Sequence, residues 1–189
     1  MSSELQKKHF AIIAKDGFEE AELTSPRQAI LDAGGTVDVI SDETGEIAAF
    51  NHFDRAGSVP VDKSIDQVSA DDYHGLVIPG GLFSPDAMRT DERYTNFARA
   101  FFEQKKPVAS ICHGPQVLIS ADLVKGRKMT AVEAVRPDLS NAGADVVDEA
   151  VIVDEGLVTS RTPDDLDAFN MKLVEEFCEG KHAGQTAVN

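Results

Sequence analysis

The side chain best suited to chemistry is the thiol of Cys112, and an imidazole follows it directly at His113. A cysteine thiolate is a strong nucleophile, and a neighbouring histidine can carry protons to and from it. The apolar run at 108–111 is typical of a buried strand, and the Gly-Pro pair at 114–115 favours a turn into a helix. We therefore expect Cys112 at a strand-to-helix elbow, where the helix N-terminus favours the thiolate over the thiol.

Two other predicted strands end beside residues that could serve the same site. Glu19 stands in the loop after a strand predicted at 9–14, and Gly81 belongs to a Gly-Gly pair after a strand predicted at 75–78. In an open α/β sheet, loops of this kind gather at the carboxyl edge, where ligands bind. We predict that the backbone N–H groups of Gly81 and His113 stabilise an oxyanion on a reacting carbonyl group.

The acidic residues at 19–22 receive two different interpretations. If Glu19 lies close to the sulfur in a dry pocket, its pKa is raised and it can donate a proton, because two anionic groups in contact cannot both stay ionised. Glu20 and Glu22 are interpreted as first-turn acids that interact favourably with the helix macrodipole. His52, a lone histidine in a polar segment, is interpreted as a solvated side chain.

Strand and helix patterns alternate along the rest of the chain. Three further elements are predicted: an amphipathic helix at 91–106, a β-hairpin at 144–160, and a last helix that starts at Pro163 and ends near Gly180. The segment at 45–61 indicates only short, irregular strands. The alternation predicts a three-layer α/β/α sandwich on a mostly parallel sheet.

Length and composition indicate a single folded unit. With 189 residues and 42% hydrophobic content, the chain can bury one sizeable core and needs no second one. We expect this domain at 9–180, a flexible N-terminus at 1–8 and a disordered tail at 181–189.

The charge balance excludes several classes of partner. The formal net charge is −15, from 33 acidic and 18 basic residues, whereas nucleic acids and anionic membranes require clustered lysine and arginine. We expect neither partner, and because the N-terminus lacks the apolar run of a signal peptide we expect a cytoplasmic protein. Cys112 and Cys178 form no CxxC motif and have no paired histidines, which indicates no disulfide framework and no metal site; Cys178 is interpreted as a packing residue.

Five motifs in order resemble those of the PfpI family, which comprises the intracellular cysteine proteases and stress-induced deglycases of the DJ-1 superfamily. They are DGFEEAE at 16–22, IPGG at 78–81, SPD at 84–86, ASICHGP at 109–115 and SRTPDDL at 160–166. The resemblance covers about 9–177, and the adjacent Cys and His are typical of the PfpI branch. It implies a flavodoxin-like fold similar to that of class I glutamine amidotransferases.

The resemblance also implies roles for single residues. Cys112 matches the nucleophile, His113 its general base, and Glu19 the buried acid that hydrogen-bonds the nucleophile. Asp86 matches an acid that reaches across a subunit interface to orient the histidine, which implies a homodimer or a hexamer built from dimers. This sequence departs from the archetypal protease in having Asp rather than Glu there, and in a loop after Gly81 that is one residue longer.

The function that these expectations favour is a cofactor-independent cysteine hydrolase of the stress response. Its partner would be a small carbonyl substrate, namely a reactive dicarbonyl, or a glycated protein. Peptide hydrolysis through a thioester is an alternative, although it requires an extended peptide groove. A non-enzymatic redox sensor that uses Cys112 is another. An ammonia-releasing glutaminase is less favoured, because the late motif at 160–166 contains no histidine.

Overall fold

A seven-stranded sheet forms the centre of the structure, a computed structural model that describes residues 5–186. The strands in spatial order are β11 (Val151–Asp154), β12 (Leu157–Ser160), β8 (Val108–Ile111), β7 (Gly75–Ile78), β1 (His9–Ile13), β3 (Thr36–Ser41) and β6 (Lys63–Ser64). All neighbours pair in parallel except β11 and β12, which form the predicted antiparallel hairpin. The parallel strands therefore share one carboxyl edge.

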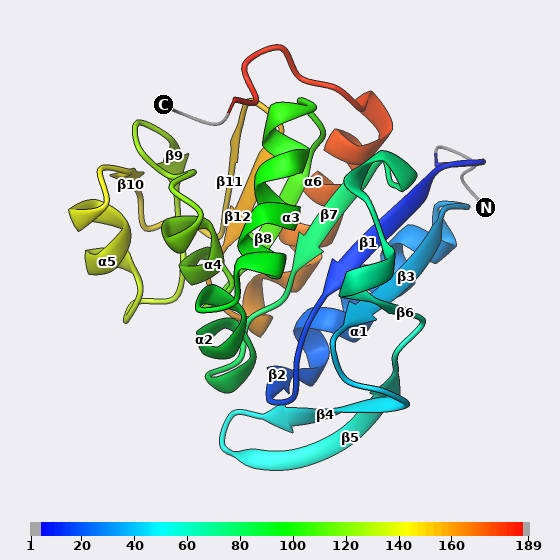
Figure 1. Ribbon diagram of the computed structural model, residues 1–189. Helices are drawn as coiled ribbons and strands as arrows, with labels where there is room; N and C mark the ends of the chain where they lie inside the picture. Colours follow the sequence, from blue (N-terminus) through cyan, green and yellow to red (C-terminus); the bar gives the residue numbers. More distant parts are fainter. Residues whose placement is uncertain (1–4, 187–189) are drawn as a thin grey trace.

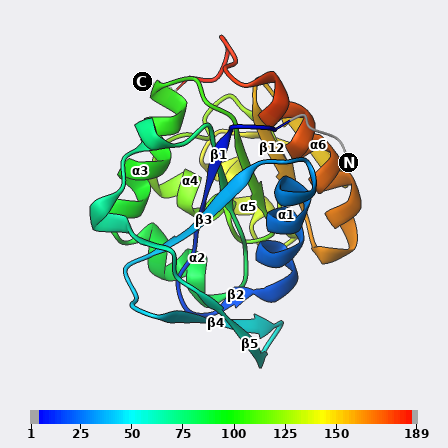
Figure 2. The ribbon, with the colours of Figure 1, turned by 90° about the vertical axis from the view of Figure 1, so that its right-hand side faces the viewer.

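Helices cover both faces of this sheet (Figures 1 and 2). On one face lie α2 (Phe83–Arg89), α3 (Glu92–Glu103), α4 (Pro115–Ser120) and α5 (Arg136–Asn141); on the other lie α1 (Glu20–Asp32) and α6 (Leu166–Glu179). One hydrophobic core lies on each face of the sheet, and alternate residues of β1 pack into each. Ala11 and Ile13 pack toward α3, while Phe10 and Ile12 pack toward α6. The predicted three-layer sandwich with a mostly parallel sheet is confirmed.

The long helices follow the apolar patterns of the sequence. The buried residues of α3 are spaced by three or four positions, as the amphipathic run predicted, and include Tyr94, Phe97, Ala98 and Phe101. The last helix starts with a 3-10 turn, η3 (Pro163–Asp165), before α6, and Gly180 ends it with a φ of 86°. Two more 3-10 turns, η1 (Ile65–Gln67) and η2 (Ala70–Asp72), connect β6 to β7.

The segment at 45–61, for which the sequence indicated only short, irregular strands, forms a β-hairpin below the carboxyl edge of the sheet (Figure 1). Strands β4 (Glu46–Asn51) and β5 (Asp54–Pro60) pair antiparallel, and β2 (Phe18–Glu19) pairs with β4. Asn51 pairs with Asp54, so His52 and Phe53 alone form the turn. The hairpin tip therefore lies near the loops that end β1 and β7.

Buried residues lie near both ends of the described chain. Leu5 is fully buried and its N–H donates to the Ala33 carbonyl group, while the flexibility expected for residues 5–8 stays a prediction. At the other end Gln185 is also fully buried and accepts a hydrogen bond from Arg127, while the disorder expected for residues 181–186 stays a prediction. The remainder of both expectations falls on residues 1–4 and 187–189, outside the described residues.

A two-stranded sheet lies beside the main one, between β9 (Lys128–Met129) and β10 (Asp145–Val146). None of the helices within residues 5–186 combines the length and apolar character needed to cross a bilayer.

Candidate active site

Cys112 occupies the predicted elbow between β8 and α4. Its φ of 60° lies in the left-handed region, which is unfavourable for a residue with a Cβ atom and is common where a nucleophile is presented at a sharp turn. Its backbone N–H donates to the Ser160 carbonyl group at 3.1 Å, and only 9% of the residue is exposed. A Cβ atom at Gly114 would lie 2.5 Å from the Ile78 carbonyl oxygen, so the sharp turn requires glycine there.

The acid beside the sulfur is Glu22, not Glu19. Glu22 is fully buried, its Oε2 accepts the Gly80 N–H at 2.8 Å, and its carboxyl group interacts with the Cys112 side chain. Its Oε1 is buried and has no hydrogen-bond partner among residues 5–186. Burial raises the pKa of Glu22 to about 8, so it is mostly protonated at neutral pH.

A sequence signal could have identified this acid. Glu22, Pro26 and Ile30 recur at intervals of four on the buried side of α1, so the carboxyl group belongs to the apolar stripe rather than to the solvated face. A first-turn acid with that spacing faces the core. The interpretation of Glu22 as a simple macrodipole partner was therefore wrong.

The imidazole of His113 lies on another side of the sulfur. Its Nδ1 is 3.3 Å from the Cys112 Sγ atom, and partial burial lowers the pKa of His113. The backbone N–H groups of Gly81 and His113 also donate toward the Cys112 side chain. Both predicted N–H donors thus face the Cys112 side chain, while their action on an oxyanion stays a prediction.

The electrostatic balance at the thiol differs from the expectation. Burial raises the pKa of Cys112, the carboxylate form of Glu22 raises it further, and the two N–H groups only partly oppose these effects. The sequence predicted a favoured thiolate from the helix N-terminus alone. In the structure, these surroundings favour the thiol over the thiolate.

Glu19 lies at the same pocket but serves a different group. Its Oε2 accepts the backbone N–H of His52 at 2.9 Å, and its Oε1 is 3.6 Å from the His52 Nδ1 atom. His52 is largely solvated, as interpreted, and it also lines the pocket. The sequence signal for a role of this turn is the pair His52-Phe53, at positions where a two-residue hairpin turn usually has Asn and Gly.

Asp86 does not reach His113 within one chain. It lies in the first turn of α2, is exposed, and makes no hydrogen bond or ion pair with any residue of the described chain. The structure thus brings together Cys112, His113, Gly81 and, at the other wall, Glu19. The expected role of Asp86 across a subunit interface stays a prediction.

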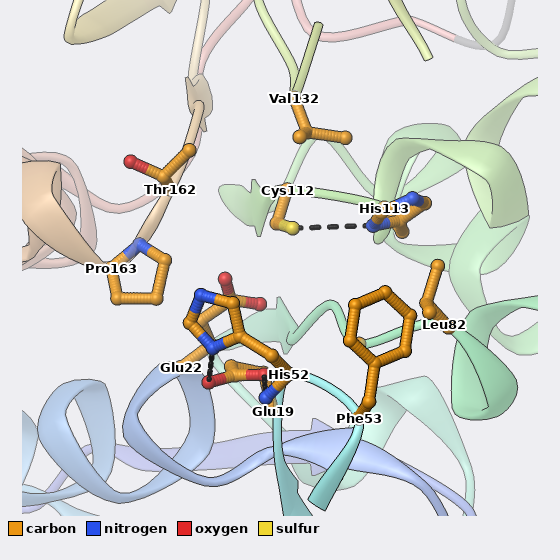
Figure 3. Close-up of a pocket in the computed structure, with 11 residues that line it drawn as sticks. Glu19, Glu22, His52, Phe53, Leu82, Cys112, His113, Val132, Thr162 and Pro163 are labelled. Atoms are coloured by element: carbon orange, nitrogen blue, oxygen red, sulfur yellow. Dashed lines mark hydrogen bonds and ion pairs between the residues drawn. The ribbon is translucent and has the colours of Figure 1, made fainter. Parts of the chain in front are cut away.

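These side chains surround a pocket of about 190 Å³ (Figure 3). The sulfur lies at its inner wall, His113 and Leu82 on one side, and His52 and Glu19 on another. The complete lining is Glu19, Glu22, His52, Phe53, Gly81, Leu82, Cys112, His113, Val132, Thr162 and Pro163. A pocket of this size can hold a small carbonyl compound beside the thiol.

One group of potential metal ligands lies elsewhere in the described chain. Glu176, Glu179 and His182 place three ligand atoms within 4.8 Å of one another at the far end of α6. An ion pair of 3.2 Å between Glu176 and His182 accounts for the closest contact in this group. These three residues do not line the pocket that contains Cys112.

Comparison with known sequences shows the family relationship of the chain. The model of the DJ-1/PfpI family matches residues 8–176. A protein of Staphylococcus haemolyticus without an assigned function is 50% identical over 171 residues, which are 89% of this chain and 97% of that protein. YraA of Bacillus subtilis, which carries a provisional cysteine protease name, is 50% identical over 163 residues, 86% of this chain and 94% of its own length.

Solved structures show the same architecture. DJ-1beta of Drosophila melanogaster superposes with a TM-score of 0.83 at 27% identity, over 94% of this chain and 91% of that chain. A two-domain protein of Anabaena variabilis, with DJ-1/ThiJ/PfpI-like and ferritin-like domains, gives a TM-score of 0.84 at 36% identity. That match covers 89% of this chain and 49% of the longer one, so this chain corresponds to about half of it. The chain belongs to the DJ-1/PfpI family.

Proposed function

We propose that this protein is a cofactor-independent cysteine hydrolase that acts on small reactive dicarbonyl compounds or on the adducts they form with proteins. The observation that carries the proposal is the surroundings of the Cys112 sulfur. A buried carboxyl group, an imidazole nitrogen at 3.3 Å and two backbone N–H groups converge on it at the wall of a small pocket. A nucleophile, proton-transfer groups and N–H donors are the parts that carbonyl chemistry requires.

The two titratable neighbours of the thiol take opposite roles at neutral pH. Glu22 holds a proton because burial raises its pKa to about 8, whereas burial lowers the pKa of His113 and leaves its imidazole neutral. His113 is then the group that accepts the thiol proton, and Glu22 donates a hydrogen bond to developing negative charge. Environments that separate two pKa values in this way assign one group as acid and the other as base.

The proposed reaction requires no redox partner. The sulfur of Cys112 adds to the aldehyde carbon, and the thiol proton passes through His113 to the new oxygen, which gives a hemithioacetal. A proton then moves from this carbon to the adjacent carbonyl carbon through an enediol, which gives the thioester of a 2-hydroxy acid. Water hydrolyses the thioester, releases the acid and restores the thiol.

Peptide hydrolysis is the second candidate, favoured by the provisional protease name of the Bacillus subtilis relative. It would use the same Cys112 and His113 to form a thioester and to protonate an amine leaving group. The pocket of about 190 Å³ fits a small aldehyde better than an extended peptide, which supports the dicarbonyl reaction as the first choice.

The decisive experiment follows the conversion of methylglyoxal to lactate by proton NMR. We expect turnover by the unmodified protein and none by Cys112→Ala. Cleavage of casein, measured in parallel, would favour the peptidase instead. Absence of both activities would contradict the proposed hydrolase, and mass spectrometry of Cys112 after peroxide treatment would then test the redox sensor.

We also propose that two copies associate around the mouth of the pocket, as a homodimer or as the dimer unit of a hexamer. Large apolar side chains are exposed there next to Asp86: Phe83 is 55% exposed, Leu82 38% and Phe53 78%. Burial of such a patch favours association. Size-exclusion chromatography with light scattering should show an assembly that Phe83→Lys weakens, and a stable monomer would contradict it.

A further inference from the structure

A second imidazole faces the pocket from the side opposite His113. His52 lies at the tip of the β4–β5 hairpin, and Figure 3 shows its ring extending into the pocket below Cys112, while His113 approaches from another wall. Its side chain is 71% exposed at the mouth, so small molecules can reach the ring.

One ring nitrogen of His52 is anchored and the other is free. Nδ1 lies 2.9 Å from the Asn51 Oδ1 atom and 3.6 Å from a Glu19 carboxylate oxygen, and Nε2 has no partner among residues 5–186. Because a carboxylate oxygen can only accept, the proton of the neutral ring belongs on Nδ1. The lone pair on Nε2 is then available as a base.

Glu19 fixes both the backbone and the ring of this histidine. Its other oxygen accepts the His52 N–H at 2.9 Å, and β2 pairs Glu19 with Phe50 of the hairpin. Glu19 itself is only 7% exposed. His52 also has a φ of 57°, a conformation in which Asn or Gly would be less strained. A turn that keeps a strained histidine against a buried carboxylate suggests a use for that ring.

The other proton-transfer groups of the pocket are engaged at the sulfur. His113 Nδ1 faces the Cys112 thiol at 3.3 Å, and the Glu22 carboxyl group is held between that thiol and the Gly80 N–H. The proposed reaction also needs a base for the C–H bond of the bound aldehyde. His52 is the remaining imidazole in the lining, and its free nitrogen has no competing partner.

We propose that His52 Nε2 carries the proton between the two carbons of the thiol-bound dicarbonyl, with Glu19 as its positioning residue. This inference rests on the proposed function. Nε2 takes the proton from the former aldehyde carbon of the hemithioacetal, and the electron pair of the C–H bond forms the carbon–carbon double bond of an enediolate while the carbonyl π electrons move to the carbonyl oxygen. The hydroxyl proton passes from the first oxygen to this second oxygen. The imidazolium then returns a proton to the adjacent carbon, which gives the 2-hydroxy thioester with no net change in His52.

The test uses a substitution that suits the turn but removes the base. His52→Asn preserves the fold because Asn tolerates positive φ, whereas general acid–base catalysis is worth at least about 100-fold in kcat. We expect that loss for methylglyoxal, with an unchanged melting temperature and an unchanged rate of Cys112 alkylation by iodoacetamide. The matched control is His74→Asn, because His74 is exposed and precedes β7, outside the pocket lining.

Glu19→Gln tests the positioning role, because the amide can still accept the His52 N–H but removes the charge beside the ring. We expect a smaller loss of kcat, and the double variant with His52→Asn should be no slower than His52→Asn alone. Additive losses would overturn the role of Glu19. If the unmodified protein is active and His52→Asn keeps its kcat, the role of His52 is overturned. The same holds if His52→Asn loses kcat and the rate of Cys112 alkylation in parallel. An unmodified protein without turnover would overturn the proposed function together with this inference.

Discussion

The carboxyl group of Glu22 lies against the thiol of Cys112, although α1 and the β8–α4 elbow are far apart in the chain. The Gly80 N–H donates to one carboxyl oxygen at 2.8 Å, and the other carboxyl oxygen is buried without a hydrogen-bond partner among residues 5–186. Burial raises the pKa of both groups, and the Glu22 carboxylate raises the pKa of the thiol further, whereas the contact with Cys112 partly lowers the pKa of Glu22. The pair therefore titrates as a unit, and its two protons leave in separate steps.

Glu22→Gln should change how stability depends on pH. The folded-state pKa is about 8 and the ordinary value is 4.5, so between these values the unfolded chain releases a proton that the folded protein keeps. Stability contributed by the protonated group is then lost as pH rises through this window, at up to about 1.4 kcal/mol per pH unit. The melting temperature of the variant relative to the unmodified protein should increase from pH 5 to pH 8, as measured by circular dichroism.

Glu20→Gln provides the control, because Glu20 belongs to the same helix turn and is only half-buried. Its melting temperature should stay parallel to that of the unmodified protein across the same pH range. A constant difference for Glu22→Gln as well would contradict the protonated state assigned to Glu22.

Gly80→Ala should displace the residues around the Cys112 thiol and destabilise the fold. The added Cβ atom would lie 2.7 Å from the Cys112 Cβ atom and 2.9 Å from the His113 nitrogen, and it would also meet the Glu22 carboxyl group. Such overpacking costs about 1–3 kcal/mol and should slow Cys112 alkylation as well. Gly57→Ala is the matched control, since its Cβ atom would meet only the flexible Glu20 side chain. Equal stability of both variants in urea would show that the site tolerates displacement.

Gln185→Ala should destabilise the whole fold although it lies near the end of the described chain. Gln185 accepts a hydrogen bond from the Arg127 guanidinium at 2.8 Å, and Arg127 is only 5% exposed. Loss of one partner of a buried polar group costs about 1–3 kcal/mol. Urea unfolding should show this loss, whereas Lys181→Ala, on an exposed position, should leave the midpoint unchanged.

Phe53→Ala should alter substrate preference. The ring lines the pocket mouth and is 78% exposed, so its removal should leave the fold intact. An aromatic contact contributes about 1 kcal/mol, roughly fivefold in kcat/KM. We expect phenylglyoxal to lose more kcat/KM than methylglyoxal in steady-state assays, and equal losses would show that Phe53 makes no contact with the substrate.

The sequence by itself determined the main elements and the position of Cys112 at a sharp turn beside His113. Apolar runs of strand length, the amphipathic spacing of α3 and the Gly-Pro turn after Cys112 are local patterns, and each acts through its own neighbours. They predicted the parallel sheet and placed Cys112 and His113 together at its carboxyl edge. Local chemistry was sufficient because adjacent residues at a sharp turn stay together in any fold that forms the turn.

Only the tertiary structure decided which acid meets the sulfur and what the hairpin does. Glu19 and Glu22 lie three positions apart, close to one helical turn, so the choice between them depends on where α1 begins and how it is rotated against β8. The placement of His52 depends on β4 pairing with β2, and the burial of Leu5 and Gln185 depends on segments remote in sequence. These contacts form only when the layers pack together, and no local pattern specifies them.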